Sequence, residues 1–499
     1  MKSYRPWSPN QSFLLPPSPL EWLPEGHLAY FVLDTVQALD LSAIEDAIQD
    51  KDGRGERPYC PAMMVALLVY GYSVGVFSSR RLARETYEDV AFRVLAGGEH
   101  PHFTTVNQFR LDHREALAKL FVQVLRLCKK AGLVKLGHVS FDGTKVAANA
   151  SKHKAMSYKR MQEEEKRLEG EVKALLGKAD EVDRSEDAQY GVGQSAEDLP
   201  QELQRREARL ARIREAKAAL EQEAAEARAE ELRERAQELR RKAADESVAL
   251  GKRREAAGRA ATAEKKARAL DGKGPDDEGP GGGGITGGDL PRHRVQTRAD
   301  GTPTPKAQRN FTDPESRIMV KGGEFLQAYN AQAAVDAEAQ IIVAALVTNQ
   351  PTDAEHLAPM LDEVAANCGQ TPVVATADSG YFSRDNAEEC ARRGVDAYIS
   401  VGRGERHLAP AEENATPAQQ ARAAMAARLA TSEGKAIYAR RKCIVEPAFG
   451  QVKQARGFRR FSFRGLLAVR AEWAFVCATH NLLKLFRSGP RPLVAAAAA

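Results

Sequence analysis

The sequence predicts an α/β fold in which a mixed sheet with flanking helices is preceded by an all-α N-terminal domain and interrupted by a long helical insertion. Residues 30–135 repeat apolar positions every three to four residues, as amphipathic helices do. Residues 153–271 consist mainly of Glu, Lys, Arg, Ala and Leu, and strand-like sequence stands on both sides of them. At 499 residues the chain exceeds a single ordinary core, so we expect two or more domains.

The first 135 residues divide into an arm and a helical domain. Residues 1–29 are rich in Pro and aromatic side chains and are predicted to form an extended arm. In residues 30–135, Thr104 or Thr105 is a suitable N-cap for the last helical stretch, and Gly132 is a suitable end. We expect this domain to bind DNA through outward-facing arginines, although a solvated helix surface explains the same pattern equally well. These arginines are Arg80, Arg81, Arg84, Arg110 and Arg114.

A first strand of the catalytic domain, within 136–152, leads into the insertion. In residues 153–271 an alternating three- and four-residue seam predicts a helical hairpin or weak coiled coil with its turn at 183–200. Residues 272–307 form a Gly/Pro-rich flexible linker by composition. Three roles are open for the insertion: it binds DNA, it dimerises the protein, or it is a tolerated spacer. Its acids nearly balance its bases, which favours protein contact or spacer over DNA. The seam consists of Leu203, Leu210, Ile213 and Leu220.

Residues 308–488 are predicted to complete the catalytic domain, and residues 489–499 form a tail. Strands and helices alternate along this part of the chain. The expected order is a hairpin at 325–336 and 340–349, a helix at 352–367 with Thr352 as its N-cap, a strand at 371–380, a helix at 383–394 capped by Ser383, a strand at 395–402, and two C-terminal helices.

Composition and charge limit the classes of function. The net charge is only +5, but between Tyr438 and Arg470 nine Lys or Arg residues stand against one acid. Such a basic patch is able to recruit phosphate. Six cysteines without a CxxC pair are expected to be reduced and buried, which argues against a disulfide framework or a zinc site. No apolar run approaches membrane-spanning length and no signal peptide is evident, so we expect a cytoplasmic protein without membrane contact.

Three acids stand out by their places in this order of elements. Asp142 follows Val139 and Phe141 in an apolar strand, Asp378 ends a second strand, and Glu446 lies on a C-terminal helix. When the first and fourth strands of a mixed sheet are neighbours, their ends lie side by side, and a helix across that edge is able to add a third acid. Converging carboxylates repel one another, so the arrangement predicts divalent cations, and oxygen ligands favour Mg²⁺ or Mn²⁺ over zinc.

Four stretches of the sequence resemble the DDE transposases of bacterial insertion sequences. They are VSFDGTKVAANAS, NFTDPESRIMVKGGEFLQAYNAQAAVD, ADSGYFS and RRKCIVEPAFGQVKQARGFRRFSFRGL. The resemblance covers most of 45–150 and 308–486 and is to the IS-four superfamily, in a branch like IS-eleven-eighty-two. It implies a ribonuclease-H-like catalytic domain. Asp142, Asp378 and Glu446 would be its DDE triad and would hold two Mg²⁺ or Mn²⁺ ions.

The resemblance also implies a Tyr–Arg–Glu–Lys signature that contacts DNA around the glutamate. Glu446 and Lys453 keep the seven-residue spacing of the family, two helical turns that put both on one face. Tyr438 lies one residue too far from Glu446, so either Arg441 acts with Tyr438 or Lys442 takes the arginine position. The expected DNA contacts are Tyr438, Arg441, Lys442, Lys453, Arg456, Arg459, Arg460 and Arg464.

By this resemblance the protein is expected to be a transposase, associated with the bacterial nucleoid. It would bind the terminal inverted repeats of its insertion sequence, cleave them and join them to target DNA by cut-and-paste transposition, as a homodimer in the active complex. One alternative is a related DNA nuclease without strand transfer; another is a non-catalytic DNA-binding or coiled-coil protein derived from a transposase. Asn330 and Gln332 line the catalytic site or, by slight preference, pair with the hairpin backbone.

Overall fold

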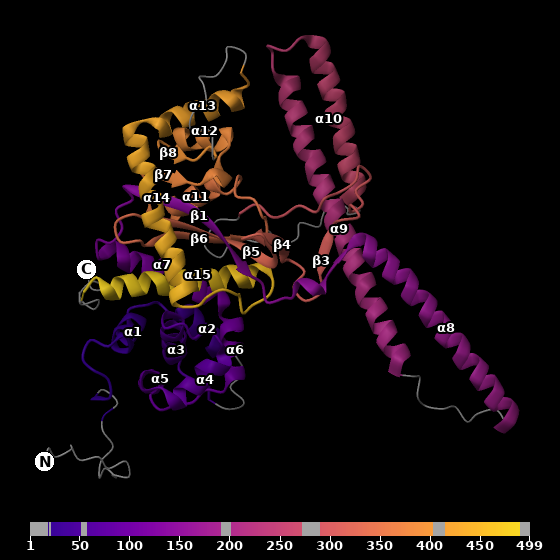
Figure 1. Cartoon of the computed structure of the whole chain (residues 1–499), viewed down its shortest axis with the longest axis horizontal. Helices are drawn as coiled ribbons and strands as arrows, with labels where there is room; N and C mark the ends of the chain where they lie inside the picture. The colour runs from indigo at the N-terminus through magenta and orange to yellow at the C-terminus, as the bar shows by residue number, and fades with distance from the viewer. Residues whose placement is uncertain are drawn as a thin grey trace.

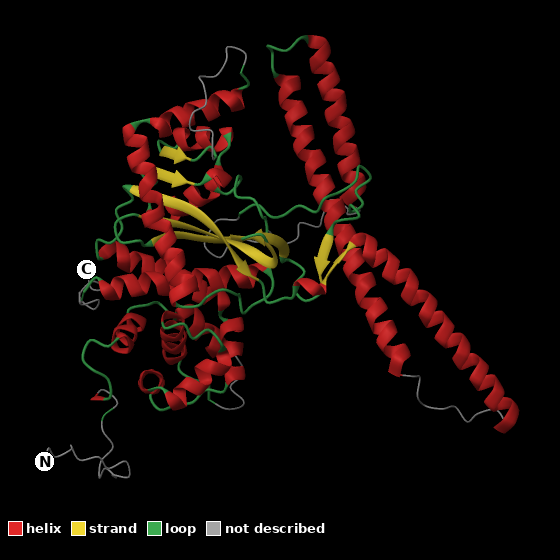
Figure 2. Cartoon of the chain, in the orientation of Figure 1, coloured by secondary structure: helices red, strands yellow, loops and turns green. Residues whose placement is uncertain are grey.

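The computed structural model places a mixed sheet among helices, with a group of short helices on one side and a long helical arm on another (Figures 1 and 2). Within the described ranges, no helix combines the length and the apolar character needed to span a bilayer. Most of the predicted N-terminal arm, the Gly-rich part of the linker and the tail lie outside these ranges. The described residues are 18, 21–50, 57–190, 201–271, 290–402 and 415–489.

Seven helices form the N-terminal domain, as the periodicity predicts. The most apolar of them, α3, is buried on nearly all sides, so it is the central helix of the group. The longest, α7, packs against the C-terminal helix α15 (Leu466–Arg487), which joins this domain to the catalytic half of the chain. The helices are α1 (Leu28–Gln37), α2 (Ser42–Gln49), α3 (Pro61–Ser73), α4 (Ser79–Glu88), α5 (Val90–Ala96), α6 (Phe103–Asp112) and α7 (Arg114–Lys130).

The last helical stretch of this domain starts and breaks differently from the prediction. Neither Thr104 nor Thr105 is its N-cap, because α6 begins at Phe103 and the ring of His102 accepts a hydrogen bond from the Thr104 amide. The helix then breaks at His113 before α7 begins. Gly132 lies just past the end of α7 with a φ of 75°, the left-handed conformation that glycine adopts most easily.

Six strands form the main sheet, and its order is β4-β5-β1-β7-β8, with β6 also paired to β5. The strand β1 is antiparallel to β5 on one side and parallel to β7 on the other, and β8 continues the parallel part. The predicted hairpin is confirmed as β5 and β6. The bounds are β1 (His138–Ala147), β4 (Arg317–Lys321), β5 (Glu324–Asp336), β6 (Ile342–Thr348), β7 (Val374–Ala377) and β8 (Asp396–Ile399).

Helices cover the sheet, and one of them crosses the edge where the acids stand. The helix α14 (Ser432–Gly450) contacts β1, β7 and β8 and continues into a π-helical turn at Gln451–Ala455 (Figure 1). The predicted helix at 352–367 begins only at Leu357, so Thr352 is not its N-cap. In the described residues after β8 there are three helices instead of the predicted two, because α13 precedes α14. The remaining bounds are α11 (Leu357–Cys368), α12 (Arg384–Arg392, with Ser383 as N-cap) and α13 (Pro417–Ala430).

The insertion is a three-helix arm (Figure 1). The helix α9 packs against α8 with its first half and against α10 with its second half, and each pairing has its own apolar core. Eight residues of the predicted turn at 183–200 belong to α8, and the rest lie outside the described residues. Of the predicted seam, Leu210, Ile213 and Leu220 are buried, and the side chain of Leu203 lies outside the described ones. The elements are β2 (Ala155–Ser157), α8 (Tyr158–Tyr190), α9 (Gln201–Ala244), α10 (Leu250–Asp271) and β3 (Gln308–Asn310).

A buried ion pair ties the N-terminal helices to the C-terminal helix. Arg110, predicted to face outward, has only 3% of its surface exposed. Its guanidinium lies 3.3 Å from Glu472 of α15 and also donates to the hydroxyl of Tyr72. The second oxygen of Glu472 accepts the Ser462 amide at 2.8 Å. Arg110 is therefore a structural residue, while Arg80, Arg81 and Arg84 are exposed as predicted.

Replacing Arg110 with Met is expected to destabilise the protein by roughly 3–5 kcal/mol, because it strands the buried Glu472 carboxylate without its cation. Urea unfolding followed by circular dichroism measures this loss. The matched control Arg81→Met removes an exposed surface pair and should cost under about 1 kcal/mol. Equal losses in the two variants would contradict the structural role of Arg110, and R110M/E472Q should recover part of the loss.

Candidate active site

Two of the three predicted acids meet at the end of the parallel strand pair. In the register of β1 and β7, Phe141 stands opposite Ala377, so the next residue of each strand is an aspartate. One Arg441 nitrogen, from α14, lies 2.9 Å from Asp142 and 3.9 Å from Asp378. The convergence predicted from the order of elements is therefore present for Asp142 and Asp378, and a guanidinium bridges them.

The two aspartates differ in their surroundings. The Asp142 side chain is 17% exposed and that of Asp378 is 42% exposed. Burial raises the pKa of Asp142 to about 6; Arg441 opposes the rise and Asp378 adds to it. Asp378 caps a short 3₁₀ turn, because its Oδ1 accepts the Gly380 amide at 2.9 Å. A buried carboxylate with a raised pKa is typical of catalytic sites.

Glu446 does not join the aspartate pair in this structure. It is exposed on α14, five residues after Arg441, which corresponds to about 140° of rotation and about 7.5 Å along an ideal helix axis. A helix that aims Arg441 at the aspartates thus turns Glu446 away from them. Among the residues described, no three His, Cys, Asp or Glu side chains lie close enough to hold a metal ion.

The pair nevertheless offers the donor chemistry that a hard divalent cation needs. Asp142 and Asp378 supply carboxylate oxygens on or next to neighbouring strands, and the guanidinium of Arg441 is the cation that lies within 4.0 Å of both. The Oδ1 of the fully buried Asn330 has no hydrogen-bond partner and lies close to Gly143, the residue that follows Asp142. These oxygens fit Mg²⁺ or Mn²⁺ better than zinc.

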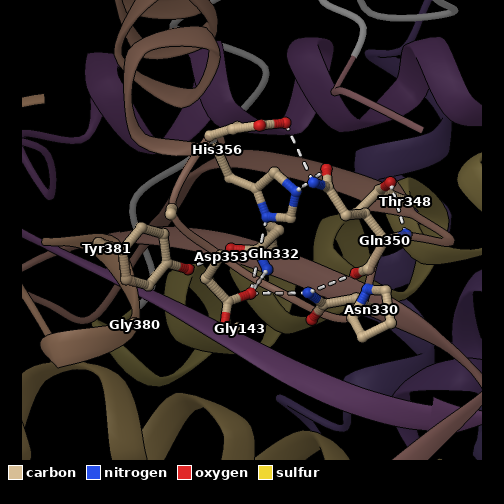
Figure 3. A network of polar contacts seen from close by, with 12 residues as sticks. Gly143, Asn330, Gln332, Thr348, Gln350, Asp353, His356, Gly380 and Tyr381 are labelled. Atoms are coloured by element: carbon tan, nitrogen blue, oxygen red, sulfur yellow. Dashed lines mark hydrogen bonds and ion pairs between the residues drawn. The ribbon is translucent and has the colours of Figure 1, made fainter. Parts of the chain in front are cut away.

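A fourth acid, Asp353, lies near the pair and was not predicted from the sequence. Figure 3 shows it at the centre of a network of polar contacts. Its Oδ1 accepts hydrogen bonds from the side chains of Asn330 at 2.6 Å and Gln332 at 2.7 Å. Lys145 lies 3.7 Å and His356 3.6 Å from the same oxygen. Burial by itself would raise the pKa of Asp353, but these four partners outweigh it and lower the pKa to about 2.

The network explains why the helix at 352–367 begins late. Asp353 is turned inward to Asn330 and Gln332, so the chain from 351 to 356 stays irregular until Leu357. The preference for backbone pairing is met only in part: the Asn330 amide donates to the Gln350 carbonyl at 3.2 Å, but the amides of Asn330 and Gln332 both also hold Asp353. Gln332 also accepts the hydroxyl of Tyr381, the residue that follows Gly380 (Figure 3). The sequence signal was two polar residues, both facing inward, in an otherwise apolar strand.

Lysines gather where β1 runs past the aspartates. The Nζ of Lys453 donates to the Thr144 hydroxyl and lies 3.1 Å from the Lys145 carbonyl, which Lys321 also approaches at 3.3 Å. Burial lowers the pKa of Lys453 to about 7, and the neighbouring Lys321 adds to this effect. A phosphate bound here would restore the charge of Lys453, because an anion stabilises the ammonium form.

The other predicted DNA contacts are distributed unevenly. Arg456 is 7% exposed, and its guanidinium donates to Thr479 at 2.7 Å inside the core, so we remove it from the set. Tyr438 is partly buried and packs on the cluster around Tyr398. Four basic residues are exposed: Lys442, Arg459, Arg460 and Arg464.

Comparison with known families agrees with this geometry. Residues 297–482 match the model of the Transposase DDE domain, and residues 18–112 match the Transposase domain (DUF772). The chain carries two transposase domains. These matches support an insertion-sequence DDE transposase; no curated protein and no solved structure matched.

The two matched segments lie on either side of the insertion. Asp378 and Glu446 lie inside the DDE match, whereas Asp142 lies between the two matches, on the strand that precedes the insertion. Only the sheet pairing of β1 with β5 and β7 returns Asp142 to the DDE domain. Four of the six free cysteines are buried, and Cys60 and Cys443 are exposed.

The raised pKa of Asp142 predicts a pH-dependent stability. Because its pKa of about 6 lies above the ordinary value of 3.8, the folded state binds this proton more tightly, so stability is lost as pH rises from about 4 to about 6. The measurement is urea unfolding in EDTA at pH 4 and pH 7. Between these pH values the unfolding free energy of Asp142→Asn should fall by roughly 2–3 kcal/mol less than that of the wild type. The control Asp385→Asn changes an exposed carboxylate and should keep the pH dependence of the wild type. Identical pH profiles for wild type and D142N would contradict the raised pKa of Asp142.

The Asp353 network predicts a graded response to two substitutions. Asp353→Ala leaves two buried amide donors unpaired and should cost roughly 2–4 kcal/mol of unfolding free energy. Asp353→Asn keeps an oxygen acceptor and should cost less. Urea unfolding at pH 7 compares them, and equal losses in both variants would show that the donors find other partners.

Proposed function

We propose that this protein is a cut-and-paste transposase that cleaves the terminal inverted repeats of its insertion sequence and joins them to target DNA. The observation that carries the proposal is the aspartate pair bridged by Arg441, inside a sheet whose second half matches the transposase DDE domain. Two acids brought together at the end of neighbouring strands suit phosphoryl chemistry with divalent cations. The active complex is a homodimer that holds two DNA ends in the bacterial cytoplasm, at the nucleoid.

The strand arrangement supports a ribonuclease-H-like fold for the catalytic domain. Three strands, β1, β5 and β6, pair antiparallel, and β7 and β8 then extend the sheet in parallel with β1. In that fold the acids stand on the first strand and at the end of the fourth, which correspond to β1 and β7 here. This proposal rests on topology alone, because no solved structure matched.

The residues take distinct roles in the proposed reaction. Asp142 and Asp378 hold one or two Mg²⁺ or Mn²⁺ ions, and bound cations of this kind activate the attacking hydroxyl and stabilise the leaving oxygen. Arg441 neutralises the aspartate pair when no other cation does so, and otherwise offers its fork to a DNA phosphate. Asp353 keeps Asn330 and Gln332 oriented behind the pair.

Glu446 is proposed as the third acid of the triad. The face of α14 that carries Glu446 also leads to Lys453, seven residues later, and Lys453 contacts β1 two residues past Asp142. Glu446 therefore stands on the side of the helix from which DNA reaches the strand end. Its side chain joins the aspartates only after α14 or its own rotamer changes, and we propose that DNA and cation binding bring this about.

DNA binding is proposed along the basic side of β1. Lys453 and the exposed Arg459, Arg460 and Arg464 form a strip that follows the last residues of this strand, and the exposed Lys442 lies on α14. The Arg464 guanidinium donates to the Asn149 carbonyl and Ala147 bridges to Arg460, so the strip is fixed to β1. Such a row neutralises backbone phosphates without reading bases.

The test is cleavage in vitro of a plasmid that carries the gene's own flanking repeats, by purified protein with Mg²⁺. We expect double-strand breaks at the repeats, abolished by EDTA and reduced at least about 10³-fold in Asp378→Asn, because the acid that holds the cation is lost. Glu446→Gln should fall by a similar factor if Glu446 completes the triad. The matched control Glu433→Gln, on the first turn of the same helix, should cleave normally.

Other outcomes would decide against parts of the proposal. Metal-dependent nicking that ignores the repeats would identify a nuclease without transposition. Full activity of E446Q with none in D378N would remove Glu446 from the triad and leave the aspartate pair as the whole acid set. Binding of the repeats without cleavage under any metal would mean a non-catalytic DNA-binding protein.

A further inference from the structure

The root of the helical insertion contains a pocket with unpaired basic residues. It has a volume of about 920 Å³ and lies between the first half of α9, the start of α8 and the β2–β3 pair. Seven of its lining residues are Lys, Arg or His, and Glu215 is the one acid in the described lining. In Figure 1 this region is where the arm leaves the sheet.

Four of these cations form no ion pair with any described acid. Within the described part of the chain, no acid lies within 4.0 Å of Lys154, Arg160, Arg205 or Arg212. Of the two other arginines in the pocket, Arg209 pairs with Glu164 at 3.3 Å and Arg309 pairs with Glu223. An unpaired guanidinium in a pocket is well placed to bind an anion, since it carries charge and five donors but meets no acceptor.

The neighbouring face of the same two helices has the opposite character. There Glu165 meets Lys217 at 2.8 Å and Arg214 at 3.2 Å, and Glu171 meets Arg206 at 3.2 Å. These ion pairs join α8 to α9 and cancel their charges locally. The near balance of acids and bases over the insertion thus conceals a segregation: paired charges hold the arm together, and unpaired cations collect in the pocket.

The geometry of the cations suits a phosphate chain. Arg205, Arg209 and Arg212 stand at positions i, i+4 and i+7 of α9, on one face, and span about 10 Å of the helix. The positions between and beyond these arginines carry small side chains, which project little from the helix. They are Ala208, Ala216 and Ala219. A row of long cationic side chains over small residues leaves room for a bulky backbone, whereas a compact anion would need only one of them.

We propose that this pocket binds the sugar-phosphate backbone of DNA in a sequence-independent manner, so that the insertion is a second DNA grip. The proposal rests on the proposed function, which makes DNA the substrate. The pocket is connected to the site through the chain: β2 lies in the segment that follows β1, and β3 leads into β4 of the sheet. DNA bound at the root of the arm therefore contacts chain segments that follow β1, the strand that carries Asp142.

The test compares DNA binding by the full-length protein and Arg205→Ala/Arg212→Ala in EDTA, so that cleavage does not intervene. Fluorescence anisotropy is measured with an element-end duplex and an unrelated duplex of equal length, between 50 and 200 mM salt. Each lost phosphate contact lowers the slope of log K against log salt by about 0.9, so the variant should lose roughly 2 in slope on both duplexes and bind on the order of tenfold more weakly. R205K/R212K should keep most of the slope.

The matched control is Arg235→Ala/Arg254→Ala, which removes two exposed arginines of α9 and α10 outside the pocket and should keep the wild-type slope. An unchanged slope in R205A/R212A, with wild type binding DNA, would overturn the proposal. A lower molecular mass of R205A/R212A in light scattering, with no change in its salt slope, would also overturn the proposal. The pocket would then be a contact with a second copy of the chain. A wild type that binds DNA with the expected slope difference but never cleaves would refute the transposase and leave the pocket standing.

Discussion

The parallel pairing of β1 with β7 is the interaction on which the site depends. These strands belong to parts of the chain separated by the whole insertion, and only their main-chain hydrogen bonds bring Asp142 beside Asp378. Two carboxylates at such an edge repel, and the fold compensates them with Arg441 from the helix that crosses the same strands. The two carboxylates are thus held side by side with the help of one neutralising guanidinium.

A buried polar network behind the pair keeps this edge rigid. Asp353 is satisfied by Asn330, Gln332, Lys145 and His356, and Gln332 in turn accepts from Tyr381. Each of these hydrogen bonds orients the next side chain, while the buried Oδ1 of Asn330 has no hydrogen-bond partner. The segment before α11 is irregular instead of helical, because Asp353 is turned inward to this network.

The insertion shows how charge composition differs from a charged surface. Summed over its length, acids and bases nearly cancel, which suggested spacer or protein contact. In three dimensions the acids are used in ion pairs between α8 and α9, while several arginines of the pocket face at the root remain unpaired. The two short strands beside the pocket fasten this face to the catalytic sheet.

The sequence by itself indicated the types of most elements, the hairpin and a resemblance to transposases, because these follow from local periodicity and from motifs in a few contiguous stretches. It also placed two acids correctly at one edge. Only the tertiary structure decided that Glu446 points away, that Arg110 and Arg456 are buried, and that Asp353 belongs beside the site. The physical reason is that side-chain direction and burial depend on helix rotation and on partners far apart in the chain, neither of which the spacing of residues records.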